Sequence, residues 1–174
     1  KVEPYRVFEI IKQGKKKGQE KDVGWACDLL PKPLLVAHAF ADEQAVLDVK
    51  IAELETAETT LAEMVEEQSG DDGVFADFDK VNKQEVNARI KEIKGNTEFA
   101  DELFMLNDWA NKTKAIAALK KQVKEQDEAL DKAVLEHYSN LTEAEVKEIV
   151  VHDKWLASLE GLITEANQVV LQNL

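Results

Sequence analysis

The chain has 174 residues, of which 44% are hydrophobic and 33% are charged, and its formal net charge is −13. This balance excludes a disordered chain and predicts one folded domain, with or without a subdomain. A single cysteine, Cys27, excludes an internal disulfide, and the longest apolar run, residues 34–41, is too short to cross a bilayer. No segment has the pattern of a signal peptide, so we expect a cytoplasmic protein.

The negative charge is unevenly distributed along the chain. Residues 1–39 carry 8 basic and 5 acidic groups, whereas residues 40–79 carry 1 basic and 13 acidic groups. A DNA-binding surface needs clustered Lys and Arg, and the acidic middle of the chain would repel a phosphate backbone. The lysine runs at 15–17 and 120–121 are therefore interpreted as solvated faces.

Residues 1–41 are predicted to form a helical or loop segment that packs on the rest of the domain. Residues 4–12 are short and amphipathic, and no stretch of the chain has a convincing strand pattern. The polar sequence QGKKKGQEKDVG then predicts a mobile loop, because glycines bound it. The apolar cluster that follows is expected in the core: Trp25, Leu29, Leu30, Leu34, Leu35 and Phe40.

Residues 42–138 predict a long helical hairpin with a compact insert at 70–108. Apolar residues recur between 42 and 68 at spacings typical of a coiled-coil seam, and SGDDG then ends the helix. A second helix of equal length is expected from about Trp109 to Tyr138, so the two should form an antiparallel pair. In the insert, Asn82 and Thr97 are expected to cap two shorter helices. These helices should close a small core that contains Phe75, Phe78, Val86, Ile90, Ile93, Phe99, Leu103, Phe104 and Leu106.

Residues 139–174 are predicted to form capped C-terminal helices. Thr142 and Glu145 have the spacing of a capping box, and Asp153 is expected to cap a last helix after a break at His152-Asp153. That helix is expected to bury Trp155, Leu156, Leu159, Leu162, Ile163, Val169 and Val170. Because the chain begins without Met and its apolar pattern runs to the final residue, we expect a truncated fragment.

Motifs for catalysis or metal binding are weak. The glycines do not cluster as they do in a nucleotide or methyl-donor loop, and a calcium loop that starts at Asp77 fails at Val81 and Asn82. Cys27 is expected to be a small buried hydrophobe. Three histidines lie too far apart in the sequence to suggest a ligand set: His38, His137 and His152. We therefore expect no catalytic, cofactor-binding or metal-binding residue in this chain.

Four segments together carry a family resemblance. They are EPYRVFEIIK, GWACDLLPKPLLVAHAFADEQ, FDKVNKQEVNARIKEIKG and LTEAEVKEIVVHDKWLASLE, in this order. The chain resembles the C-terminal region of the methylation (M, HsdM) subunit of type I restriction–modification systems. The resemblance covers nearly the whole chain and is strongest in residues 22–54 and 134–160.

The resemblance implies a parent subunit that methylates adenine N6 in DNA and uses S-adenosylmethionine. Its donor-binding and Asn/Asp-Pro-Pro-aromatic motifs would lie upstream, and this chain contains no Pro-Pro, so it is expected to be catalytically silent alone. The implied partners are the specificity subunit, whose long helices receive the C-terminal helices, and the restriction subunit in the full complex. DNA would be reached through the assembled complex.

Within the expected all-α fold, six stripe residues are candidates for contact with the specificity subunit: Ile51, Leu54, Leu61, Ile116, Val123 and Leu130. Glu58 and Gln126 interrupt the two stripes with polar groups, which can specify register and partner. The structural alternative is that the stripes pack only on each other. The functional alternative is a stand-alone coiled-coil scaffold or adaptor without any link to methylation.

Overall fold

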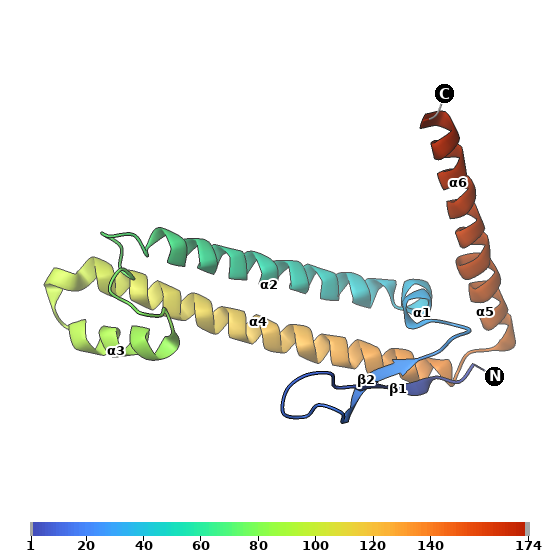
Figure 1. Cartoon of the computed structure of the whole chain (residues 1–174), viewed down its shortest axis with the longest axis horizontal. Coiled ribbons are helices and arrows are strands. Elements are labelled where there is room, and N and C mark those ends of the chain that lie inside the picture. The colour runs from blue at the N-terminus through green and yellow to red at the C-terminus, as the bar shows by residue number, and fades with distance from the viewer. Residues whose placement is uncertain (1, 173–174) are drawn as a thin grey trace. The chain divides into compact units, whose positions relative to one another are not determined.

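The computed structural model describes residues 2–172, and it describes residues 157, 167 and 169–172 by their backbone alone. The described chain is mostly helical with one two-stranded sheet, which confirms the all-α class (Figure 1). In chain order the elements are β1 (Tyr5–Ile10), β2 (Glu20–Ala26), α1 (Lys32–Ala39), α2 (Ala41–Glu67), α3 (Lys83–Ile93), a 3-10 turn (Thr97–Phe99), α4 (Ala100–Tyr138), α5 (Glu143–Glu148), a π-helix (Ile149–Leu156) and α6 (Ala157–Gln172).

The chain divides into two compact units. Unit 1 combines the chain up to Ala45 with the chain from Glu128 onwards, and unit 2 is Val46–Asp127. The long helices α2 and α4 therefore contribute residues to both units. Each unit is described separately below.

The N-terminal hairpin corrects the expectation of a helical or loop segment. β1 and β2 pair antiparallel, with Tyr5 opposite Ala26 and Ile10 opposite Glu20. The aromatic and β-branched residues of YRVFEI favour a strand. A short apolar pattern is equally compatible with a helix, however, and only pairing with a second strand decides between the two. The partner strand, Glu20–Ala26, is not predicted from the sequence, because it begins with polar residues and lacks an alternating apolar pattern. The predicted mobile loop is instead a structured strand and turn.

The core of unit 1 surrounds Tyr138, the last residue of α4. Its hydroxyl donates to the Leu30 carbonyl at 2.7 Å, and its ring meets Trp25 edge-on at 5.2 Å. Burial raises the pKa of Tyr138 to about 12, so the phenol stays protonated and remains a donor. Of the predicted N-terminal cluster, Leu30 and Leu35 are fully buried, whereas Leu29 is 48% exposed. The other buried apolar residues of this unit are Cys27, Val36, Leu130, Val134, Ile149 and Val150.

Unit 2 contains an antiparallel helix pair made by parts of α2 and α4, which run side by side in Figure 1. Lys50 Nζ donates to Gln122 Oε1 at 3.2 Å, and Lys120 pairs with Glu58 at 2.6 Å. One end is closed by a buried cluster of Met64, Phe75, Val86, Ile93, Leu106 and Trp109. The predicted small core is therefore present, except that Phe104 is 72% exposed.

The start of α4 differs from the prediction. Asn82 caps α3 as expected, because its side-chain oxygen accepts from the amides of Gln84 and Glu85. Asn96, rather than Thr97, caps the 3-10 turn, which leads directly into α4 at Ala100. The two long helices are therefore unequal, with 27 residues in α2 and 39 in α4.

The C-terminal part of unit 1 is helical from α5 through the π-helix to α6 without a break. The predicted break at His152-Asp153 is absent, because both residues lie within the π-helix. None of the helices in residues 2–172 combines the length and the hydropathy that a membrane crossing requires.

Leu106 and Phe104 provide a matched stability test on one helix. Leu106 is fully buried in the unit 2 cluster, so Leu106→Ala should lower the free energy of unfolding by about 2–5 kcal/mol through lost burial and a residual cavity. The mostly exposed Phe104 serves as the control, and Phe104→Ala should change it by less than about 0.5 kcal/mol. Urea unfolding followed by circular dichroism measures both. Equal losses would contradict the described core.

Candidate functional site

The six predicted stripe residues are at least half-buried in the fold. Ile116 and Leu130 are buried, and Ile51, Leu54, Leu61 and Val123 are half-buried. Leu61 also packs against the buried cluster at the end of unit 2. This burial favours the structural alternative, in which the stripes pack within the helix pair.

The two polar residues that interrupt the stripes have different surroundings. Glu58 is 44% exposed and pairs with Lys120 across the helix pair, so this charge already has a partner in unit 2. The Oε1 atom of Gln126 is buried without a hydrogen-bond partner among the described residues. An unpaired buried acceptor lowers stability, so Gln126 marks a weaker position in the stripe of α4.

The end of the π-helix and the first part of α6 present apolar side chains to solvent. Their exposures, between 44% and 63%, contradict the expected burial of this segment. We call this surface the C-terminal apolar face, and it consists of Trp155, Leu156, Leu159, Leu162 and Ile163. Spacings of three, four and seven place these residues along one side of a helix. The side chains of Val169 and Val170, predicted to be buried with them, lie outside the described residues.

A capping box fixes the start of the helical segment that carries this face. The Thr142 hydroxyl accepts from the Glu145 amide at 3.3 Å, and the Thr142 amide donates to the Glu145 carboxylate at 2.8 Å. The Thr142 hydroxyl also donates to that carboxylate at 2.7 Å. These bonds hold the pKa of Glu145 below its ordinary value. The capping box predicted from the sequence is therefore present at this junction.

The π-helix is tied to the chain that follows β2. Lys154 Nζ donates to the carbonyl oxygens of Asp28 and Leu29 at 3.0 and 2.9 Å. Asp153 lies 3.1 Å from His38 Nδ1 and does not cap a new helix, which corrects the predicted role of Asp153. The sequence predicted a cap because Asp is common at helix starts. It could not predict the contact with His38, which lies more than a hundred residues away in the chain.

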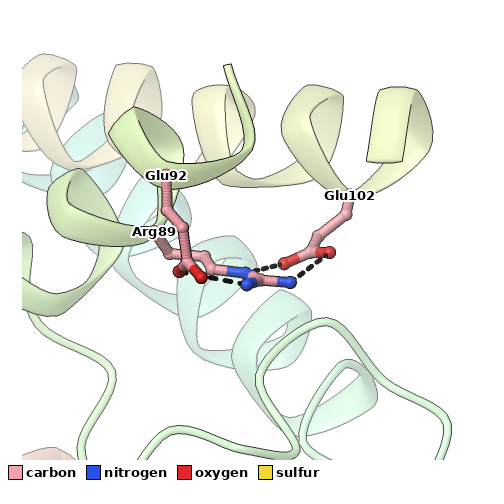
Figure 2. Close-up of polar contacts among 3 residues, drawn as sticks. All are labelled: Arg89, Glu92 and Glu102. Atoms are coloured by element: carbon pink, nitrogen blue, oxygen red, sulfur yellow. Dashed lines mark hydrogen bonds and ion pairs between the residues drawn. The ribbon is translucent and has the colours of Figure 1, made fainter. Parts of the chain in front are cut away.

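A polar cavity of about 570 Å³ lies in unit 2 beside α3. Among the described residues that line it, Arg89 is the one cation. Figure 2 shows its guanidinium held by two carboxylates: Nε and Nη2 donate to Glu102 at 2.6 and 3.1 Å, and Nη1 donates to Glu92 at 3.1 Å. Two carboxylates neutralise the guanidinium and accept from all three of its nitrogens, so this arrangement ties α3 to the start of α4.

Side chains that could hold a metal do not form a cluster in the described part of the chain. No cluster of three or more His, Cys, Asp or Glu residues suited to a metal occurs in residues 2–172. His137 meets the Phe40 ring edge-on, and Cys27 is buried with an exposed fraction of 5%.

Comparisons of the chain with protein-family models, with curated proteins and with solved structures each gave no match.

The capping box gives a pH-dependent prediction. The pKa of Glu145 is lower in the folded chain than in the unfolded chain, where it is about 4.3. The ionised carboxylate therefore stabilises the fold at a pH above about 4.3. This stabilisation is lost as the pH falls through the pKa of the folded chain. Thr142→Ala removes the hydroxyl and should raise the pKa of Glu145 toward its ordinary value. Thr142→Ser keeps the hydroxyl and should preserve the low pKa. Carbon-detected NMR titration of the Glu145 carboxyl measures the change, and an unchanged pKa in Thr142→Ala would contradict the box.

Proposed function

We propose that this chain is the C-terminal helical part of the methylation subunit of a type I restriction–modification system, and that it assembles with the specificity subunit. The family resemblance of four ordered segments, including LTEAEVKEIVVHDKWLASLE, supports this proposal. In this proposal the adenine-N6 methyltransferase chemistry and the S-adenosylmethionine site belong to the parent subunit. The role of this chain is protein assembly, with the restriction subunit joining the full complex and DNA held by the assembled subunits.

The exposed C-terminal apolar face is the observation that carries the docking proposal. Trp155, Leu162 and Ile163 are each more than half exposed, although an amphipathic helix normally buries this side. Contiguous exposed apolar side chains are typical of surfaces that bind another protein, and Trp is a common anchor in such interfaces. A helical surface of the specificity subunit would cover these side chains by helix packing.

The attachment of this face suits a docking surface. The Thr142–Glu145 capping box fixes the start of the helical segment, and Lys154 ties the π-helix to two backbone carbonyls of the same unit. A surface that is held in place before binding loses less conformational entropy on association. The proposed contact surface is therefore the C-terminal apolar face. Five of the six stripe residues lie in the helix pair of unit 2, and Leu130 lies in the core of unit 1.

The second candidate function is a stand-alone coiled-coil scaffold or adaptor. The stripes favour it, because their residues are buried or half-buried in the chain by itself. The parent reading frame distinguishes the two candidates. An upstream Asn-Pro-Pro-Tyr-type motif supports the methylation subunit, whereas a start codon just before Lys1 supports the adaptor.

The docking proposal predicts a stable complex with the specificity subunit from the same operon. Size-exclusion chromatography with light scattering should show a joint complex for the wild-type chain and none for the double variant Leu159→Asp, Ile163→Asp. The charged side chains would have to be desolvated on binding, so affinity should fall at least a hundredfold.

A matched control uses two exposed apolar residues of α2. Val46 and Val49 are 54% and 58% exposed, so Val46→Asp, Val49→Asp introduces the same charges outside the proposed surface and should leave the complex intact. Loss of the complex in both variants would assign the effect to charge alone. Absence of any wild-type complex would reject the docking role, and self-association of the wild-type chain alone would support a scaffold.

A further inference from the structure

The C-terminal apolar face begins inside the π-helix Ile149–Leu156, which is eight residues long. A π-helix bonds each amide to the carbonyl five residues earlier, whereas an α-helix uses the carbonyl four residues earlier. Most π-helical segments in proteins are single turns, and they occur frequently at functional sites. A π-helix of eight residues is therefore unusual, and this one joins α5 to the helix that carries most of the proposed docking surface.

The sequence of this segment weakens the α-helical register. Ile149, Val150 and Val151 are three consecutive β-branched residues, and each loses side-chain freedom against the preceding turn of an α-helix. Neither glycine nor proline occurs in residues 143–156, so nothing in the sequence ends the helix here. The local preference for the α register is therefore reduced, and contacts with the rest of unit 1 can decide between the two registers.

The π-helix is attached to unit 1 at both ends. At its start, Ile149 and Val150 are buried in the core of this unit. Toward its other end, Lys154 Nζ donates to the carbonyl oxygens of Asp28 and Leu29 at 3.0 and 2.9 Å. Hydrogen bonds from a charged donor are stronger than those between neutral groups, so the two bonds of Lys154 form an effective tether.

A second contact links the π-helix to α1. Asp153 Oδ2 lies 3.1 Å from His38 Nδ1, and the two side chains are 40% and 33% exposed. Ion pairs with this degree of exposure contribute little stability, so we assign most of the attachment at this end to Lys154. The residue that follows the tether, Trp155, is the first member of the C-terminal apolar face.

The register of the π-helix determines the direction in which this face points. A π-helix has more residues in each turn than an α-helix, so the same eight residues turn the chain through a smaller angle. If Ile149 and Val150 stayed in the core, a change to α-helical bonding would therefore rotate α6 about its own axis. Trp155 and the face residues of α6 would then point in a different direction from unit 1.

We propose that Lys154 is a positioning residue for docking. Its bonds to the Asp28 and Leu29 carbonyls hold the π register, and this register directs the C-terminal apolar face toward the specificity subunit. This role rests on the proposed docking function and deepens it, because it names the contact that controls the docking surface. A purely structural lysine would instead add stability without any effect on the register.

The first measurement is the helical register of the full chain alone. NMR couplings through hydrogen bonds identify the carbonyl that each amide contacts, and wild-type amides near the end of the π-helix should couple to carbonyls five residues earlier. Lys154→Met removes the ammonium group but keeps the length of the side chain, so the couplings should move to carbonyls four residues earlier. Lys154→Arg retains a charged donor and should keep the wild-type pattern.

Docking is measured separately, by titration of each variant with the specificity subunit. Lys154→Met should weaken the complex at least tenfold, whereas Lys154→Arg should bind within threefold of the wild-type chain. The matched control is Lys147→Met, which changes the net charge equally. Lys147 is exposed and pairs with Glu143 on its own helix, so this variant should keep the π register and bind within twofold.

Val151→Ala tests the same balance without removing the tether, and it remains informative if Lys154→Met fails to fold. Val151 is 38% exposed, and Ala favours the α register more than a β-branched residue does. The variant should show both coupling patterns and bind the specificity subunit at least threefold more weakly. An unchanged register together with unchanged affinity would contradict the proposed balance.

The two measurements distinguish failure of the positioning role from failure of docking. Four-residue couplings in the wild-type chain, or five-residue couplings in Lys154→Met, would overturn the positioning role. A changed register with unchanged affinity, or equal weakening by Lys147→Met, would also overturn it. Absence of any wild-type complex would reject the docking function and this role with it, and the register of the chain alone would be known in either case.

Discussion

The hydrogen bond from the Tyr138 hydroxyl to the Leu30 carbonyl is a buried anchor of unit 1, the unit that also carries the C-terminal apolar face. It joins the end of α4 to the segment that follows the hairpin, and Trp25 packs edge-on against the same ring. Trp25 Nε1 and Lys32 Nζ both donate to Asp131, about two turns before Tyr138 in α4. Polar and aromatic contacts therefore both fix the base of the hairpin to α4.

Apolar side chains are distributed in this chain according to whether a partner element lies within reach. The stripes of α2 and α4 are buried or half-buried, and the end of unit 2 is closed by a cluster that includes Phe75 and Trp109. The C-terminal apolar face has no such cover among the described residues. Because desolvation of apolar surface drives association as well as folding, the uncovered face is the place where a further protein would gain most.

Charged side chains also differ in whether another part of the chain supplies a partner. Acidic groups dominate residues 40–79, and Glu58 finds its partner on α4 in Lys120. The lysines at positions 12 and 15–17, in the turn between β1 and β2, have no ion-pair partner among the described residues. The paired charges along the helices mainly adjust helix packing.

The sequence by itself determined the elements that depend on local chemistry. Asn82 and the Thr142–Glu145 box cap helices through contacts two or three residues away, and the seam of the helix pair follows from apolar periodicity. Only the tertiary structure decided what depends on distant partners. It paired Tyr5–Ile10 with a polar strand, joined Asp153 to His38, and left Trp155 and Leu162 exposed. The physical reason is that strand pairing, long-range ion pairs and burial are set by neighbours that a local pattern does not contain.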